Sequence, residues 1–346
     1  MRKLSPLIFF ILLLAACGPG TALPPAPASP AAFDWYTVYF SDPAGPDAGS
    51  LRGGPDADLA ASIDAARLSV DAALYDLNLW SIRDALLAAH RRGVTVRLVV
   101  ESSHLDREEF TALKDAGIVI LGDRREPLMH NKFVVIDRYE VWTGSMNLTL
   151  NGVYRNNNNL LRLRSSRLGE NYTAEFEEMF VDDAFGAGSP ANTPYPKLAI
   201  DGTPVETYFS PEDNVENRIV QLIDEAQTSI HLLAFSLTAD RVGEALLQAY
   251  RRGVAVSGVI ETGQASNQGT EFFRLVDAGL DIILDGNPKN MHHKVMIIDS
   301  HIVIVGSYNF SRAAKESNDE NSLILFNSEI ASLFLEEFDK IYAVGQ

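Results

Sequence analysis

The feature that most constrains this chain is that its body is built twice. The segment Ala89–Val94 (AHRRGV) recurs as Ala249–Val254 (AYRRGV), 160 positions later. Asp115–Gly117 likewise recurs as Asp277–Gly279, 162 positions later. Near-constant offsets over such a length indicate that one supersecondary unit is used twice, so the fold must contain two similar halves.

Each half carries the same order of expected elements. Helices 78–92 and 239–252 both end at Arg-Arg-Gly, which places basic residues in the last turn and a glycine just beyond it. Strands that alternate with helices predict an α/β layered unit. In the order helix, strand, helix, strand, helix, strand, we expect 57–67, 68–75, 78–92, 94–100, 106–116 and 118–121, and again 215–227, 228–235, 239–252, 254–260, 269–278 and 280–284.

A segment rich in glycine and proline, residues 185–205, separates the two halves. Its composition is typical of a linker. We therefore predict a first lobe over 33–190 and a second over 205–346, two similar α/β sandwiches packed as one bilobed body. Two independent duplicated domains are the alternative, and the single body is favoured because the motif described below needs both halves.

The N-terminus is predicted to be a signal peptide, residues 1–16. Basic Arg2 and Lys3 precede a mostly apolar stretch, Leu4–Ala16, that is too short to span a bilayer comfortably. The stretch ends in Leu-Ala-Ala before Cys17, the only cysteine of the chain. This pattern resembles the lipobox of bacterial lipoproteins, in which the cysteine is lipidated. An ordinary secretory signal with a chance cysteine is the alternative.

The uncharged stretch 17–32, rich in proline and alanine, predicts an extended tether between the lipidated Cys17 and the first lobe. Together these features imply an extracytoplasmic lipoprotein, anchored in the outer membrane or at the cell surface. Gly18 rather than aspartate after the cysteine favours the outer membrane, by resemblance to bacterial sorting.

Composition narrows the classes of partner. The 346 residues include 29 Lys and Arg against 46 Asp and Glu, a net charge of −17. Such an acidic chain lacks the general basic footprint of a duplex-binding protein, although it leaves room for a local basic pocket. With a single cysteine, neither an intrachain disulfide nor a cysteine-based zinc site can form. We expect no metal and no cofactor.

One extended motif occurs in both halves. It reads His-x-Lys-x4-Asp-x6-Gly-Ser-x-Asn and comprises His130, Lys132, Asp137, Ser145 and Asn147, then His292, Lys294, Asp299, Ser307 and Asn309. The histidine and lysine stand two residues apart at the start of a buried strand, so they point to the same face. Serine hydroxyls, asparagine amides and a glycine turn can donate to anionic oxygens. Two copies around one cavity predict a phosphodiester site.

The duplicated motif resembles the HKD signature of the phospholipase D superfamily, and with the repeat the resemblance covers about residues 33–346. It implies a metal-independent reaction in two steps. One histidine attacks phosphorus as a neutral imidazole, while the other protonates the leaving alkoxide and then activates water or an alcohol. The lysines and asparagines of the motif would stabilise charge on the non-bridging oxygens, and its serines would complete the phosphate-binding set.

The halves differ at a position that bears on the roles of the histidines. Glu320 lies eleven residues after the second motif, and Asn158 lies eleven residues after the first. In the family that the motif resembles, a second-half glutamate commonly supports the first-half histidine, which fixes the tautomer and raises its basicity. We therefore expect His130 to be the nucleophile and His292 the general acid, with the reverse assignment as the alternative.

Three residues of the motif region are expected not to touch the substrate. Asp137 and Asp299 belong to the catalytic motif but are separated from the His-Lys pair by a full strand, so a supporting role at the strand end is favoured. His293 follows His292 directly, and adjacent strand residues face opposite ways. A non-catalytic His293 is therefore favoured over a third catalytic imidazole.

Two further pairs of residues occupy matching strand ends in the two halves. For Tyr75 and Phe235, packing in the core is favoured over a place in the pocket wall. Glu101 and Glu261 could face the ligand crevice that forms at strand ends of α/β sheets, or form a solvated cap. The sequence does not decide between these two interpretations.

Three functions are compatible with the sequence. The first is a monomeric, membrane-tethered phosphodiesterase that hydrolyses phospholipid headgroup esters or transfers the phosphatidyl group to an alcohol, and needs no obligatory protein partner. The predicted anchor and the acidic charge favour it. The alternative is an extracytoplasmic nuclease of the same superfamily, for which the chain shows no basic, aromatic-interleaved patch. A catalytically silent binding module is disfavoured because every His, Lys, Ser and Asn of the motif is intact.

Overall fold

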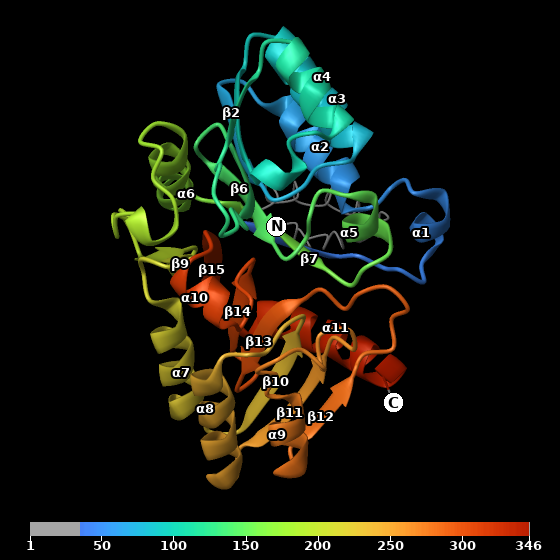
Figure 1. The fold of residues 1–346 in the computed structure, drawn as a ribbon, viewed down its shortest axis with the longest axis vertical. Helices are drawn as coiled ribbons and strands as arrows, with labels where there is room; N and C mark the ends of the chain where they lie inside the picture. Colours follow the sequence, from blue (N-terminus) through green and yellow to red (C-terminus); the bar gives the residue numbers. More distant parts are fainter. Residues whose placement is uncertain (1–34, 346) are drawn as a thin grey trace, which may run out of the picture. The chain divides into compact units, whose positions relative to one another are not determined.

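The computed structural model describes residues 35–345, which belong to one compact unit that begins at Trp35 (Figure 1). The predicted signal peptide 1–16, the predicted lipidation site Cys17 and the predicted tether 17–32 lie outside the described residues. Among the helices of residues 35–345, none combines the length and the apolarity needed to cross a membrane.

The first lobe, blue to green in Figure 1, is built on a mixed sheet of seven strands. The strand order is β1-β7-β6-β5-β2-β3-β4, in which β2, β3 and β4 are parallel and all other neighbours are antiparallel. The strands are β1 (Tyr36–Phe40), β2 (Ser69–Leu74), β3 (Thr95–Val100), β4 (Val119–Gly122), β5 (Lys132–Ile136), β6 (Glu140–Gly144) and β7 (Asn159–Arg164).

The second lobe repeats this sheet and adds one strand at the edge. Its order is β12-β11-β10-β13-β14-β15-β9-β8, with β9 in the place of β1 and with β8 as the addition. The strands are β8 (Lys197–Ile200), β9 (Thr203–Ser210), β10 (Ser229–Ala234), β11 (Ala255–Ile260), β12 (Asp281–Leu284), β13 (Lys294–Ile298), β14 (Ile302–Gly306) and β15 (Glu320–Phe326).

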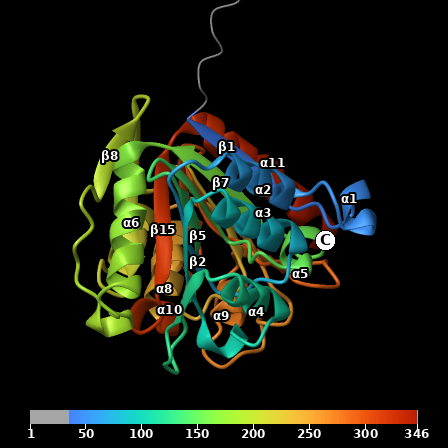
Figure 2. The same ribbon diagram turned by 90° about the horizontal axis from the view of Figure 1, so that it is seen from above.

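Helices pack on both sheets. In the first lobe α2 and α3 lie side by side (Figure 2), and α7 and α8 repeat this pair in the second. The longer helices are α2 (Pro55–Ala65), α3 (Trp80–Arg91), α4 (Glu108–Asp115), α6 (Ser166–Phe180), α7 (Val215–Glu225), α8 (Asp240–Arg251), α9 (Phe272–Asp277) and α11 (Ser328–Gly345). Short segments are α1 (Pro46–Ser50), α5 (Leu150–Tyr154), α10 (Arg312–Glu316) and the 3₁₀ turns η1 (Ser102–His104) and η2 (Gly186–Gly188).

The two lobes share an apolar core, in which α6 and α11 each pack on both sheets. The ring of Tyr172 in α6 packs edge-on against Phe133 of β5 and Phe209 of β9, with centroids 5.0 and 5.2 Å away. Phe334 of α11 packs edge-on against Phe40 of β1 at 5.1 Å. Each of these helices therefore buries aromatic area against a strand of the other lobe. The predicted fold class, two similar α/β lobes packed as one body, is confirmed.

The sheet of the second lobe begins earlier than we predicted. β8 and β9 belong to this sheet, so the boundary predicted at 205 falls inside β9. Pro204 contributed to the linker-like composition of 185–205, but it lies near the start of β9, opposite Ala199 of β8. Proline is tolerated near the start of a strand, because no central ladder hydrogen bond is lost there.

Asp137 and Asp299 form the hairpin turns that follow β5 and β13. The backbone has positive φ at Asp137 (53°) and Arg138 (55°), and again at Asp299 (52°) and Ser300 (50°). Two consecutive residues of this conformation make the tight turn that suits the twist of a hairpin. The aspartates therefore lie after the far end of each strand, roughly 16 Å of extended chain beyond the motif lysine.

Each turn aspartate also fixes its hairpin to the strand beside it. The Asp137 carboxylate accepts backbone N–H groups from Arg67, Leu68 and Ser69, at 3.1, 2.7 and 3.0 Å. The Asp299 carboxylate repeats this with the backbone N–H groups of Gln227, Thr228 and Ser229. Burial raises the pKa of Asp299, but these backbone donors outweigh burial and lower it overall.

Replacing a turn aspartate is expected to cost stability and not activity. Asp137→Ala should lower the free energy of unfolding by about 1–3 kcal/mol, because three backbone donors lose a charged acceptor. Urea unfolding followed by circular dichroism measures this change. Asp137→Asn keeps one acceptor oxygen, so its free energy of unfolding should lie between those of the wild type and Asp137→Ala. A loss of turnover at unchanged stability would contradict the structural role.

Candidate active site

The first motif places a histidine and a lysine together at the start of β5. His130 is buried, and its Nδ1 lies 2.8 Å from Oε2 of Glu320. Lys132 Nζ donates to the backbone carbonyl oxygen of His130 at 2.7 Å. The ring of Tyr75 packs edge-on against the His130 ring, with centroids 5.0 Å apart. Lys132 Nζ lies 5.0 Å from the centre of the Tyr75 ring.

The second motif repeats this arrangement at the start of β13. The Nδ1 atom of His292 lies 2.9 Å from Oδ1 of Asn158, and Lys294 Nζ donates to the carbonyl oxygen of His292 at 2.9 Å. Phe235 takes the place of Tyr75, with its ring centre 4.6 Å from that of His292 and 4.7 Å from Lys294 Nζ. Tyr75 and Phe235 therefore contact the histidines directly, which favours the pocket-wall interpretation of this pair.

The partners of the histidines are exchanged between the lobes. Glu320 begins β15 of the second lobe but binds His130 of the first, and Asn158 of the first lobe binds His292 of the second. The backbone repeats the exchange, because the N–H groups of His130 and His292 donate to the carbonyl oxygens of Asp319 (3.0 Å) and Asn157 (2.9 Å). Neither histidine is held by its own lobe alone.

The motif serines hold these partners. Ser145 Oγ donates to Asn158 Oδ1 at 2.9 Å, and Ser307 Oγ donates to Glu320 Oε2 at 2.7 Å. Both serines are fully buried. We predicted them as phosphate ligands, but each hydroxyl proton is already used in positioning the residue that binds a histidine.

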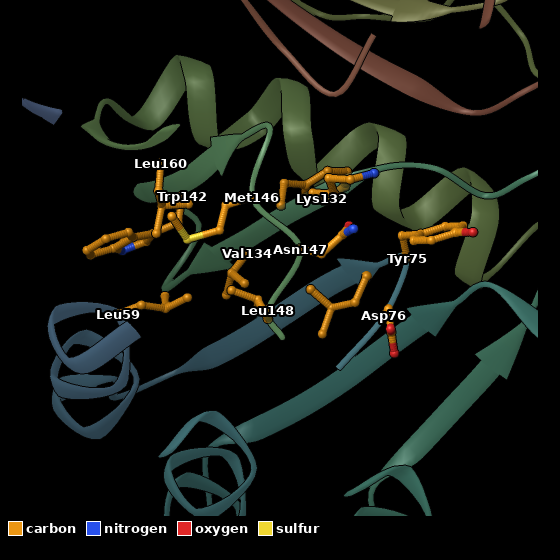
Figure 3. A pocket seen from close by; sticks show the side chains of 12 residues that line it. Leu59, Tyr75, Asp76, Lys132, Val134, Trp142, Met146, Asn147, Leu148 and Leu160 are labelled. Carbon is orange, nitrogen blue, oxygen red and sulfur yellow. The ribbon is translucent and has the colours of Figure 1, made fainter. Parts of the chain in front are cut away.

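The motif asparagines are placed differently from the serines. Asn147 and Asn309 are only partly buried, and Oδ1 of each has no hydrogen bond partner among the described residues. Asn147 lines a small cavity beside Tyr75 and Lys132, whereas apolar side chains such as Trp142 form its other end (Figure 3). Asn147 therefore lies beside the motif lysine, where we expect a phosphate.

Glu101 and Glu261 neither face a ligand crevice nor form a solvated cap. Both are buried, and their Oε2 atoms accept the backbone N–H groups of Met129 (3.0 Å) and Met291 (2.6 Å). These methionines immediately precede the two histidines. The glutamates thus fix the backbone just before each histidine. We did not predict this role, although the matching positions of the two glutamates pointed to a shared one.

His293 is held in a buried network that joins it to Asn159, a neighbour of the motif serine Ser145, and to α11. Its Nδ1 lies 2.9 Å from Nδ2 of Asn159, and its Nε2 lies 3.4 Å from Oε1 of Glu337. Asn131, the corresponding residue of the first lobe, bonds Glu175 at 2.9 Å and Asn321 at 2.8 Å. The residue between histidine and lysine thus helps to hold α6 in the first lobe and α11 in the second.

The electrostatics of the site favour an anion. Burial lowers the pKa of His130 and His292 well below the usual value, and the charges of Lys132 and Lys294 lower it further. Burial lowers the pKa of Lys132 to about 7, against the opposing charge of Glu320. Burial also lowers the pKa of Lys294, and the charge of Lys132 adds to this. Burial thus disfavours the charged forms of two imidazoles and two lysines, and a phosphodiester would supply compensating negative charge.

The chain matches one known family twice. Domains of the family described as "Cardiolipin synthase, PLD-like domain" match residues 59–180 and 219–342. The two matches together cover well over half of the chain, so the chain belongs to this family of phospholipase D-like domains, in duplicate. The resemblance to the phospholipase D superfamily is thereby confirmed.

Relatives and solved structures agree with this family. The chain is 33% identical over 126 residues to the mitochondrial cardiolipin hydrolase of Homo sapiens, which covers 36% of this chain and 50% of that protein. It is 31% identical over 134 residues to a phospholipase D of Rickettsia typhi, 39% of this chain and 66% of that protein. The chain thus spans about half to two thirds of the length of these relatives. A phosphatidylserine synthase from Haemophilus influenzae has the same fold, with a TM-score of 0.64 at 11% identity over 88% of this chain and 85% of that one.

Inorganic phosphate should bind between the two motifs. We expect it to raise the thermal midpoint of the full chain, because the anion neutralises buried positive charge. Lys294→Met should weaken binding at least about tenfold, since a charge-assisted hydrogen bond is lost. Isothermal titration calorimetry measures the affinity, and Lys289→Met, at an exposed lysine near the second motif, is the control. Equal binding by the wild type and Lys294→Met would contradict the assignment.

Proposed function

We propose that this phospholipase D-like chain is a phosphodiesterase that hydrolyses phospholipid headgroup esters through a phosphohistidine intermediate. The observation that carries the proposal is the pair of buried histidines, one from each lobe, whose Nδ1 atoms are held by Glu320 at 2.8 Å and Asn158 at 2.9 Å. With Nδ1 engaged, Nε2 is the nitrogen of each ring that is available to a substrate.

The reaction follows from these two nitrogens. Nε2 of one neutral imidazole attacks phosphorus, and the bond to the leaving alkoxide breaks as the other imidazolium donates its proton to that oxygen. The second imidazole, now neutral, takes a proton from water. The resulting hydroxide displaces the first histidine from phosphorus, and an alcohol in place of water would give transfer instead of hydrolysis. Lys132 and Lys294 stabilise the charge that develops on the non-bridging oxygens.

The different partners divide these roles between the histidines. Glu320 is a carboxylate when ionised, so it fixes the Nδ1–H tautomer of His130 and raises the basicity of Nε2. Asn158 Oδ1 binds His292 without adding a charge, and this orientation of the amide is fixed because Asn158 Nδ2 donates to the carbonyl oxygen of Gly152 at 2.9 Å. We therefore propose His130 as the nucleophile and His292 as the general acid.

The choice of a phospholipid substrate rests on three observations. The names of the relatives, a phospholipase D and a cardiolipin hydrolase, refer to lipid phosphodiesters. The net charge of −17 disfavours a polynucleotide, which needs a basic track. The predicted lipidation of Cys17 would hold the chain at a membrane surface, where the substrate is concentrated.

We also propose that the protein acts as a single chain at an extracytoplasmic membrane surface. Each lobe supplies the residue that holds the other lobe's histidine, so one chain can contribute both halves of the site. We therefore propose a monomer that needs no protein partner. Once the signal peptide 1–16 is removed, the lipid on Cys17 would keep the body attached, and the tether 17–32 would hold it clear of the membrane plane.

The pH dependence of turnover tests the role of Glu320. Burial raises the pKa of Glu320 to about 8, against the effects of Lys132 and Ser307, and the nucleophilic tautomer needs the ionised carboxylate. We expect kcat/KM to rise with pH up to about 8, and Glu320→Gln to lose this rising limb. The lysines and the imidazolium of His292 titrate in the opposite sense, so only the rising limb reports on Glu320. A limb that persists in Glu320→Gln would contradict the assignment.

A pair of substrate assays on the full chain in detergent tests the function. With chelator present, we expect release of headgroup from phosphatidylglycerol or phosphatidylcholine and no cleavage of single- or double-stranded DNA. His130→Ala and His292→Ala should each lower kcat by at least about 10³-fold. His293→Asn, which copies Asn131 of the first lobe, should retain activity. Cleaved DNA beside untouched lipid would establish the nuclease alternative.

Trapping the intermediate separates the two histidines. In His292→Ala the second step is slowed because no imidazole activates water, so a phosphoryl adduct should accumulate on His130 and be found by mass spectrometry after a rapid quench. An adduct on His292, in a chain with His130→Ala, would reverse the assigned roles.

A further inference from the structure

α6 of the first lobe contacts β9 of the second (Figure 1). Three carboxylates lie close together in this region. Glu175 and Glu178 come from α6, and Glu212 follows β9. One oxygen from each side chain lies within 4.8 Å of the other two. We call this set the interlobe acidic cluster. It lies apart from the motif side chains, although Glu175 also accepts a hydrogen bond from Asn131, the neighbour of His130.

The cluster is buried and lacks a balancing charge. Glu178 is 2% exposed, and neither of its carboxylate oxygens has a hydrogen bond of good geometry, although Ser189 and Asn192 lie nearby. Oε2 of Glu212 is also buried without a partner. Within residues 35–345, no lysine, arginine or histidine forms a salt bridge with any of the three glutamates.

The neighbouring acids do not share this deficit. Asp319 pairs with Arg125, and the carboxylate of Asp213 accepts from Thr193 Oγ1 at 3.0 Å and from the Phe209 backbone N–H at 2.9 Å. Within this group of acids, the carboxylate oxygens buried without a partner therefore belong to Glu178 and Glu212. Burial raises the pKa of Glu178 to about 7, and the charges of Asp319 and Asp213 add to this. Burial raises the pKa of Glu212 to about 8, and the charge of Glu178 adds to it. Uncompensated carboxylates of this kind bind either protons or a cation.

The duplication supplies an internal control for the missing charge. Glu337 of α11 corresponds to Glu175, and Lys340 corresponds to Glu178, each 162 positions later. In the second lobe Glu337 is partnered by Lys340 Nζ at 3.9 Å and by His293 Nε2 at 3.4 Å. The first lobe therefore has a buried glutamate on α6 where the second has a lysine on α11, a lysine whose side chain is 72% exposed.

From this contrast we infer that Glu175, Glu178 and Glu212 bind a divalent cation, Ca²⁺, which links α6 to the second lobe. Carboxylate oxygens are the ligands that hard cations prefer, and Ca²⁺ accepts irregular sets of six to eight of them. The three oxygens lie within 4.8 Å of one another, close enough for one ion to contact all of them. A set of carboxylates from a helix and a loop suits the flexible coordination of Ca²⁺ better than the strict octahedron of Mg²⁺. Glu212 is only partly buried, which gives an ion a route from solvent.

The cation site is independent of the proposed phosphodiester chemistry. The ion would neutralise the cluster and hold the two lobes together, and no reacting atom would contact it. This site could not be predicted from the sequence, because Glu175 and Glu178 belong to a helix that we did not predict and Glu212 is distant from both along the chain.

Thermal unfolding of the full chain, first stripped with chelator, tests the inference. Ca²⁺ at about 100 times its dissociation constant should raise the midpoint by roughly 5 °C. Glu178→Lys, which reverses the charge at this position, should abolish this response. Glu178→Gln should also lose the response, whereas Glu170→Gln, an exposed carboxylate of the same helix, should keep it.

Direct binding decides the matter if a variant fails to fold. Calorimetric titration of the wild type with Ca²⁺, and in parallel with Mg²⁺, should give one Ca²⁺ site per chain with weaker Mg²⁺ binding. A wild type that neither binds Ca²⁺ nor shifts its midpoint would show that the cluster holds protons, and would overturn the inference. So would a full Ca²⁺ response in Glu178→Lys, or tighter binding of Mg²⁺ than of Ca²⁺. Headgroup release is not a readout here, so failure of the proposed function would leave this test intact.

Discussion

The structure depends on the exchange of histidine partners between the lobes. Glu320 holds His130 and Asn158 holds His292, and both pairs are buried. In a buried site a hydrogen bond to an imidazole is strong, and leaving one partner unpaired is costly, so the lobes cannot separate without exposing or orphaning these groups. The shared aromatic core around Tyr172 and Phe334 also holds the two lobes together. Site geometry and lobe packing are therefore one constraint.

The repeat made most of the fold predictable, and burial explains what was missed. The strands β5 and β13 follow from their apolar runs, and α3 and α8 from their periodicity and their glycine stops. α6 was not predicted, because Gly169, Asn171 and Thr173 weaken its intrinsic helix preference. The helix forms because Tyr172 and its apolar neighbours are buried between the two sheets, which only the assembled body provides.

Some residues of the candidate site were predictable from the sequence, and others were not. The His-Lys pairs were predictable because an i, i+2 spacing on a strand fixes a common face. The pairing of Glu320 with the first-half histidine came from the family resemblance, since no spacing rule brings residues 190 positions apart into contact. The serines could not be placed from residue type alone, because a hydroxyl suits a phosphate as well as a carboxylate. Glu101 and Glu261 have no local sequence signal beyond their matching positions.

Covalent linkage of the two lobes has a consequence for how the site can evolve. In a homodimer of a single-motif chain, any substitution appears twice, so both imidazoles necessarily have identical surroundings. Fusion of the copies into one polypeptide removes that symmetry. Glutamate beside one imidazole and asparagine beside the other, or tyrosine against one and phenylalanine against the other, are differences that only a tandem chain can maintain. Each copy is thereby free to specialise in one half of the reaction.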